Sequence, residues 1–242
     1  MNLKFITAHS WLTGAGSLRS TWLYMVSSMG FPLSLLFVVG VLSDGTLLPY
    51  ALAGGLISIV ATNGIFTMAD LGMFKFEYMY KDLVVTTKTS PIDYMFGVVL
   101  ADFFWSIPAI VIYFILDIIF GILTPYSFVM TLIVASLVLL STASLGFVLT
   151  SLVKHQRFVW AITSLLSLVM MIFPPTFYPY KYLPHWILLI LAISPTTTAA
   201  VLEQGFFGLA PTLWYMLYIL VAETIILFMI AKYLTVWRKL GA

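Results

Sequence analysis

Long apolar stretches separated by short polar segments make up most of this sequence. They predict six membrane-spanning helices, at about residues 22–42, 48–69, 95–116, 128–152, 158–174 and 212–231. These stretches are close to the ~20 apolar residues that a helix needs to cross a bilayer. The pattern therefore predicts an all-α integral membrane protein in which residues 1–242 form a single transmembrane domain.

The stretch at 175–211 is also apolar and aromatic, but prolines divide it into short pieces. The apolar run that remains at 186–193 is too short to cross a bilayer. We therefore expect one or two short re-entrant helices that enter the outer leaflet without crossing it. The dividing prolines are Pro179, Pro184, Pro195 and Pro211.

One segment, residues 70–94, is much more polar than the rest of the chain. It carries seven charged residues, whereas the whole chain has only 11 basic and 9 acidic residues. Residues 77–87 can form about three helical turns, with Glu77 and Lys81 at the i, i+4 spacing that favours an ion pair. Ser90 and Pro91 then stop this helix before the next span. A solvated loop is the simpler interpretation, but the other loops are short, so we interpret this one as the docking site of a soluble partner.

The basic residues predict the orientation of the chain. With the predicted spans, ten of the 11 Lys and Arg residues fall on one side of the membrane and only Lys181 on the other. Basic residues concentrate on the cytoplasmic side of membrane proteins. We therefore expect a multi-pass protein of the cell membrane, with both termini, the N-terminal segment 1–21 and the loop 70–94 in the cytoplasm.

Composition excludes a soluble fold and narrows the chemistry. Only 8% of the residues are charged and 62% are hydrophobic, whereas soluble domains are about 25% charged. Without cysteine there is no thiol nucleophile, disulfide or thiolate metal site. The histidines, His9, His155 and His185, lie in different segments, so no metal site is expected. Clustered carboxylates are missing from the sequence pattern, which argues against an intramembrane enzyme.

A few polar residues fall inside the predicted spans, where a charge near the bilayer centre costs about 2.5–3.5 kcal/mol. Glu223 lies near the middle of the sixth span. It is either a cation, proton or substrate site, or a carboxyl group that is neutral or hydrogen-bonded to a neighbouring helix. Asn63, with Thr62 and Thr67, favours contacts between helices. Asp102 is two turns into the third span, near enough to the cytoplasmic side to be wetted.

Several motifs, taken in order, resemble those of the ABC-2 type transporter permeases. The polar loop ends in Thr89-Ser90-Pro91, and Gly97 stands at the head of the third span. The 175–211 segment matches the family's proline-rich start, Leu-Pro-x-Trp step, Pro-x-Thr step and acidic residue before a glycine. The matching residues are Tyr178-Pro179, Leu183-Pro184-His185-Trp186, Ser194-Pro195-Thr196-Thr197, and Glu203 before Gly205 and Gly208.

This resemblance implies the transmembrane subunit of an ABC exporter, without an ATPase site of its own. Two separate ATP-binding cassette subunits would hydrolyse ATP with Mg²⁺, and the permease would pair with a second copy or a sister subunit. The chain itself lacks a G-x-x-x-x-G-K-[ST] loop, which agrees with this division. We expect membrane lipid around it, no cofactor bound to it and no nucleic-acid partner.

The resemblance also implies which residues act. The loop 70–94 would hold a coupling helix that contacts the ATPase through Glu77, Tyr78, Lys81, Asp82, Leu83, Thr86 and Thr87. An extracellular gate would comprise Phe177, Tyr178, Pro184, Trp186, Pro195 and Glu203.

Few charged residues lie along the expected path, which favours a hydrophobic or amphipathic substrate of the lipid, drug or glycolipid class. Two alternatives stay open. An ion-coupled secondary carrier would use Glu223 and need no ATPase. A scaffold protein would need the polar loop but no polar path.

Overall fold

The computed structural model describes residues 2–20, 22–78, 84, 86–87 and 89–234, which form helices joined by turns. This described part contains no strand, so the all-α prediction is confirmed for it. A π-helical turn (Trp11–Ala15) joins the first two helices, and a 3-10 turn (Tyr180–Tyr182) precedes α9. The α-helices are α1 (Leu3–Ser10), α2 (Gly16–Ser20), α3 (Trp22–Leu42), α4 (Leu48–Phe76), α6 (Pro91–Ile119), α7 (Pro125–Leu152), α8 (Gln156–Ile172), α9 (His185–Leu191), α10 (Pro195–Phe206) and α11 (Tyr215–Leu234).

Among the described residues, four helices are long and apolar enough to cross a membrane, namely α4, α6, α7 and α11. The other two predicted spans coincide with shorter apolar helices, Met29–Leu42 within α3 and Gln156–Ile172, which is α8. The length and apolar composition of these helices indicate a membrane protein. The total of six spans stays a prediction.

The polar loop is shorter than the sequence pattern predicted. Helix α4 continues to Phe76 instead of ending near residue 69, and α6 begins at Pro91 instead of near residue 95. Leu71 is buried against other helices, which favours the extension of α4. Pro91 occupies the first turn of α6, where its missing N–H costs nothing, and a capping box of Ser90 and Asp93 satisfies free amides there.

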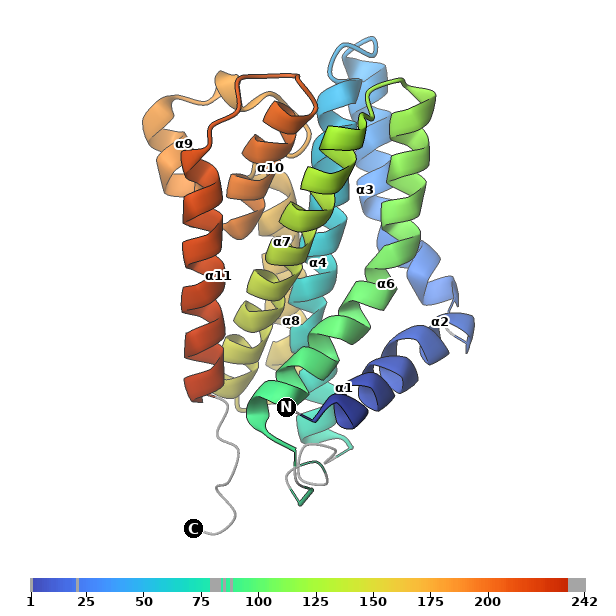
Figure 1. Cartoon of the computed structure of the whole chain (residues 1–242), viewed down its shortest axis with the longest axis vertical. Coiled ribbons are helices and arrows are strands. Elements are labelled where there is room, and N and C mark those ends of the chain that lie inside the picture. The colour runs from blue at the N-terminus through green and yellow to red at the C-terminus, as the bar shows by residue number, and fades with distance from the viewer. Residues whose placement is uncertain (1, 21, 79–83, 85, 88, 235–242) are drawn as a thin grey trace.

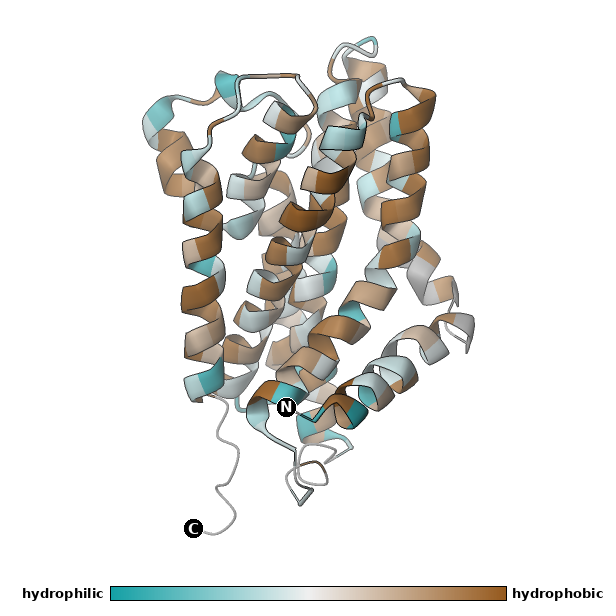
Figure 2. Cartoon of the chain, in the orientation of Figure 1, coloured by the Kyte–Doolittle hydropathy of each residue, from teal (hydrophilic) through white to brown (hydrophobic). Residues whose placement is uncertain are grey.

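Helix α4 is the central helix of the bundle (Figure 1). It packs against α3, α6, α7, α8 and α10. In its most apolar stretch of 18 residues, 89% is buried inside the protein. In the most apolar 18-residue stretch of α11, only 17% is buried. Ile225 and Met229 of α11 are exposed. Figure 2 shows apolar residues along the outer helices, including α11. Such a surface is unfavourable in water and stable against lipid.

The short helices α9 and α10 lie at the upper end of the bundle in Figure 1, opposite the N-terminus. With 7 and 12 residues they are too short to cross a bilayer. Helix α10 packs against α4, α7 and α11. The segment 175–211 therefore contains short helices, and their re-entrant depth in lipid stays a prediction.

The N-terminal segment is helical and packs against α6. Helix α1 lies along the lower part of α6 in Figure 1. Its expected position at the cytoplasmic interface stays a prediction.

A glycine of α4 permits one of its closest contacts. A Cβ atom on Gly54 would lie 1.9 Å from the carbonyl oxygen of Thr176, which follows α8. Because that neighbour is backbone, we expect Gly54→Ala to force the two elements apart and to destabilise the protein by about 1–3 kcal/mol. The melting temperature of the purified protein in detergent measures this loss.

Gly30→Ala in α3 is the matched control, since a Cβ atom there meets nothing within 4 Å. It should leave the melting temperature unchanged or slightly higher, because alanine favours helix more than glycine. Equal melting temperatures for the two variants would contradict the close packing at Gly54.

Candidate functional site

The segment between α4 and α6 is attached to neighbouring helices at its α4 end. Lys75, in the last turn of α4, donates from Nζ to the carbonyl oxygens of Thr150 and Val153, each at 3.1 Å. These carbonyls lie at the C-terminus of α7, where a helix has free carbonyl groups and a partial negative charge. Just beyond, Gln156 of α8 donates to Glu77 at 3.2 Å. The helices α4, α7 and α8 are thus joined where the segment begins.

The α6 end of the same segment is held by a helix cap. The Ser90 hydroxyl oxygen accepts from the Asp93 amide at 3.1 Å, and one Asp93 oxygen accepts from the Ser90 amide at 3.2 Å. The other Asp93 oxygen accepts from the Asn2 amide at 2.9 Å. Thr87 donates to the Thr89 hydroxyl oxygen at 2.7 Å, just before the cap. This end of the segment is therefore joined to both α6 and the N-terminus.

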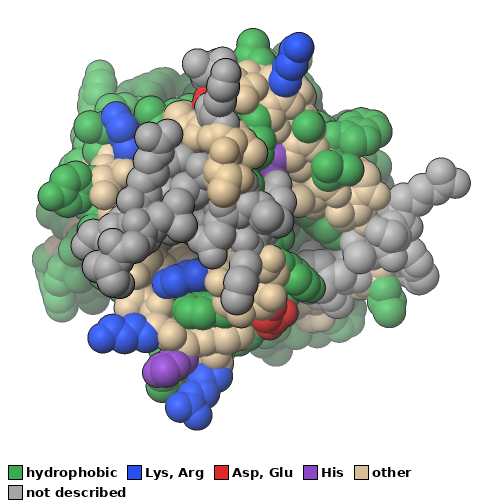
Figure 3. All heavy atoms as spheres, turned by 90° about the horizontal axis from the view of Figure 1, so that it is seen from below, with side chains coloured by type: hydrophobic (Ala, Val, Ile, Leu, Met, Phe, Trp, Pro, Cys, Tyr) green, Lys and Arg blue, Asp and Glu red, His purple; other side chains and the backbone are tan. Residues whose placement is uncertain are grey.

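The predicted ATPase-contact residues are only partly within the described chain. Four of them lie in turns or bends and are exposed, namely Glu77, Tyr78, Thr86 and Thr87. Three lie outside the described residues, namely Lys81, Asp82 and Leu83. The coupling helix over 77–87 therefore stays a prediction. Figure 3 shows Lys and Arg side chains around this lower face of the molecule.

A cavity of about 250 Å³ lies between the N-terminal helices, α4 and α6. Its apolar lining residues are Leu12, Phe66, Phe74 and Trp105, and its polar ones are Thr13, Ser17, Asn63, Asp70 and Asp102. Thr67 donates to the carboxyl group of Asp102, and Asn63 donates to Ser106 at 3.0 Å. The Trp105 indole donates to the Thr13 carbonyl oxygen at 3.0 Å. The cavity therefore combines aromatic walls with a few polar groups, as small-molecule sites do.

Two polar residues from the sequence meet in this cavity. Asn63 joins α4 to α6 through Ser106, which is the helix–helix contact that the sequence favoured. Asp102, expected to be wetted, is only 5% exposed and lines the cavity. Trp105 was not predicted, and its only signal was an indole N–H inside an apolar span, where such a group requires a partner.

Glu223 lies elsewhere, in an apolar groove of about 430 Å³ formed by α11 and residues that follow α9. Thr198 of α10 donates to its carboxyl group at 3.2 Å. This contact agrees with a carboxyl group hydrogen-bonded to a neighbouring helix. A role for Glu223 in carrying an ion or a substrate stays a prediction.

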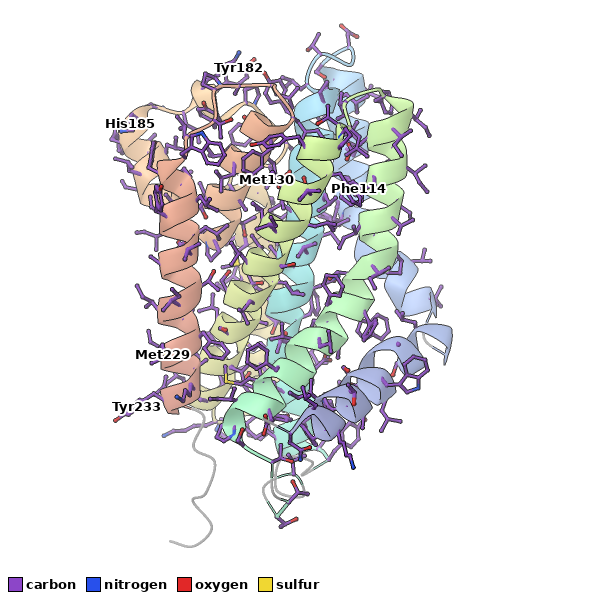
Figure 4. The ribbon with its side chains drawn as sticks, viewed as in Figure 1. Phe114, Met130, Tyr182, His185, Met229 and Tyr233 are labelled. Atoms are coloured by element: carbon purple, nitrogen blue, oxygen red, sulfur yellow. The ribbon has the colours of Figure 1, made fainter. Side chains whose placement is uncertain are left out.

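The predicted gate residues differ in their burial, and their role as a gate stays a prediction. Three are buried, namely Phe177, Pro195 and Glu203, while Tyr178 is half-buried. Two are exposed at the surface, namely Pro184 and Trp186. Figure 4 shows their neighbours Tyr182 and His185 at the upper rim of the molecule.

Gln204 of α10 organises this end of the bundle, and sequence reasoning missed it. Its Nε2 donates to the carbonyl oxygens of Pro175 at 2.7 Å and Tyr178 at 3.0 Å, while its Oε1 accepts from the Tyr180 amide at 3.0 Å. The segment after α8 is thereby held against α10. The sequence did contain a signal, namely an uncharged amide side chain in an apolar stretch. Because buried polar groups are almost always hydrogen-bonded, such a side chain is expected to have partners in a neighbouring segment.

His9 of α1 is buried where α1 meets α6. Its ring stacks on Phe5 with centroids 5.6 Å apart and meets Tyr94 edge-on at 5.7 Å. Gly97 gives the ring room, since a Cβ atom there would lie 3.2 Å from it. Burial lowers the pKa of His9 to about 4, so the docked imidazole is neutral at pH 7.

A comparison with protein families finds one match over most of the chain. The family model described as ABC-2 type transporter matches residues 3–202. This region contains the N-terminal helices, the polar segment, the cavity and most of α10. A search of curated proteins found no match.

Acid should weaken the docking of α1. Because the pKa of His9 is about 4 in the folded protein and 6.5 ordinarily, the unfolded chain takes up a proton first as the pH falls. This stability is fully present above pH 6.5 and declines toward pH 4, by up to about 1.4 kcal/mol per pH unit. Melting temperatures between pH 7.5 and 4.5 should therefore fall less steeply for His9→Phe than for the unaltered protein.

His155→Phe is the control for this pH series, because His155 is exposed. It should keep the pH dependence of the unaltered protein. A His9→Phe curve parallel to the unaltered one would show that His9 does not cause the acid sensitivity.

Proposed function

The chain belongs to the ABC-2 type transporter family, and from this we propose that it is the membrane-spanning permease subunit of an ABC exporter. Two separate ATP-binding subunits supply the energy, and a second copy or a sister permease completes the transmembrane part. The protein lies in the cell membrane with both termini in the cytoplasm. It moves a hydrophobic or amphipathic substrate outward.

The attachment of the polar segment at both ends carries this proposal. Lys75 joins its start to the end of α7, and the cap formed by Ser90 and Asp93 joins its end to α6 and Asn2. A force applied to the segment would reach several helices at once, because neither end can move alone without breaking these hydrogen bonds. A passive solvated loop has no need of such attachments.

We infer the following transport cycle. ATP binding closes the partner subunits and pushes the segment over residues 77–87. The push moves α4 and its packing partners, among them α3 and α8. An outward path then opens below α9 and α10. The aromatic and polar lining of the inner cavity supports an amphipathic substrate.

The ATPase partner can be tested directly. We expect an ATP-hydrolysing subunit to copurify with the detergent-solubilised chain and to be lost when Asp82 and Leu83 are both replaced by alanine. Asp44→Asn, in the exposed turn at the other end of the bundle, should retain it. An affinity pull-down followed by an ATPase assay measures both.

A chain that purifies alone and transports without ATP would contradict the exporter. Loss of that transport in Glu223→Gln would identify the ion-coupled carrier instead.

Lys75 tests transmission separately from docking. Lys75→Met removes the hydrogen bonds to the end of α7 but keeps an apolar stem, so the ATPase subunit should still bind. Substrate-dependent ATP hydrolysis in proteoliposomes should fall about tenfold, a coupling loss of about 1.4 kcal/mol. Lys154→Met, at an exposed lysine next to the end of α7, is the control and should leave the rate unchanged. Equal rates for the two variants would show that Lys75 transmits nothing.

A further inference from the structure

Four buried oxygen atoms without hydrogen-bond partners lie on α6 and α10 in the described part of the chain. In the described part of the chain, both carboxylate oxygens of Asp117, Oε1 of Glu203 and the Tyr113 hydroxyl have no hydrogen-bond partner. All three side chains are 0% exposed. An unpaired buried polar group costs about 1–3 kcal/mol, and such groups in native proteins often mark an ion or a water.

Tyr113, Asp117 and Glu203 lie near enough to one another for charge to act between them. Tyr113 and Asp117 stand one turn apart on one face of α6, and the Asp117 charge acts on both the Tyr113 hydroxyl and the Glu203 carboxyl group. Thr131 of α7 donates to the other Glu203 oxygen at 2.6 Å. A Cβ atom on Gly55 would lie 2.6 Å from the Tyr113 hydroxyl, so α4 closes one side. Helix α7 therefore borders the Glu203 carboxyl group, and α4 borders the Tyr113 hydroxyl.

The turn between α6 and α7 holds Asp117 in place. Its backbone carbonyl oxygen accepts from the amides of Ile122 at 2.9 Å and Leu123 at 3.3 Å. Figure 4 labels Phe114 and Met130, the chain neighbours of Tyr113 and Thr131, in the upper half of α6 and α7. The site therefore lies toward the end of the bundle that carries α9 and α10.

Charge balance indicates what would fill this space. Two carboxyl groups are buried together, and no basic side chain acts on either of them within the described chain. Two buried charges without compensation are strongly unfavourable. Protons would also remove this charge, and stabilisation by acid would then replace a response to a metal ion. A metal ion instead converts every unpaired oxygen into a ligand.

We propose that Asp117, Glu203 and Tyr113 bind a hard metal cation where α4, α6, α7 and α10 meet. An oxygen-only set of carboxylates and hydroxyls selects ions such as Ca²⁺, Mg²⁺ or Na⁺ over softer metals. The cation joins α10 to α6, two elements that otherwise repel each other through their carboxylates. Its occupancy therefore controls how firmly α10 is held against the spans.

This proposal is independent of the exporter function, and the purified full chain tests it. The protein is stripped with EDTA, and its melting temperature is measured after adding CaCl₂, MgCl₂ or NaCl at matched ionic strength. At a concentration a hundredfold above its Kd, the bound cation should raise the melting temperature by about 5–10 °C. Metal analysis after dialysis should find about one ion per chain.

Two substitutions locate the ion. Asp117→Asn and Glu203→Gln should abolish the rise, yet melt no lower than the unaltered protein in EDTA, because each removes the repulsion between carboxylates. Asp44→Asn, at the same end of the bundle but exposed, should keep the full rise.

Three outcomes would overturn the proposal. The first is an unaltered protein that responds to no cation and retains no metal. The second is a cation response that survives in Asp117→Asn, which would place the ion elsewhere. The third is stabilisation by acid alone that disappears in Asp117→Asn, which would show that protons neutralise the pair.

Discussion

Close packing around α4 is the constraint on which the rest of this bundle depends. In the described part of the chain, α3, α6, α7, α8 and α10 pack against α4, which contacts some of them through positions that have no side chain. Gly54 contacts the backbone at Thr176, and Gly64 lies against Thr142 of α7. In lipid there is little hydrophobic force between helices, so such backbone approaches and interhelical hydrogen bonds hold the spans together. Movement of α4 must therefore move its neighbours, which is the property that a permease driven by an external ATPase requires.

Polar side chains attach the segments that are not spans. Lys75 fastens the polar segment to the end of α7, Asp93 fastens the N-terminus to α6, and Gln204 fastens the segment after α8 to α10. Each uses a side chain to satisfy backbone groups that have no partner within their own helix. Because unsatisfied backbone is costly in a bilayer, these attachments are specific as well as stabilising.

The interface of α4 with α6 carries polar groups at two levels. Near the N-terminal helices, Asn63 and Asp102 line a cavity and have hydrogen-bond partners. Farther along α6, Tyr113 and Asp117 are buried without such partners. The polar groups at the first level therefore lie beside apolar walls, whereas the oxygens at the second level are buried without hydrogen-bond partners.

The sequence alone determined the all-helical membrane character, the polar segment and the short helices between α8 and α11, because hydrophobic length and proline spacing are local properties. The family came from the resemblance of its motifs. The tertiary structure decided which polar residues meet. Asp117 and Glu203 are 86 positions apart in the printed sequence and looked unclustered, yet both are fully buried and the charge of Asp117 acts on Glu203. Lys75 and Gln204 likewise bind carbonyl groups of other segments. Such contacts depend on how helices pack, which hydrophobic periodicity does not specify, because spans that are apolar on every side have no preferred face.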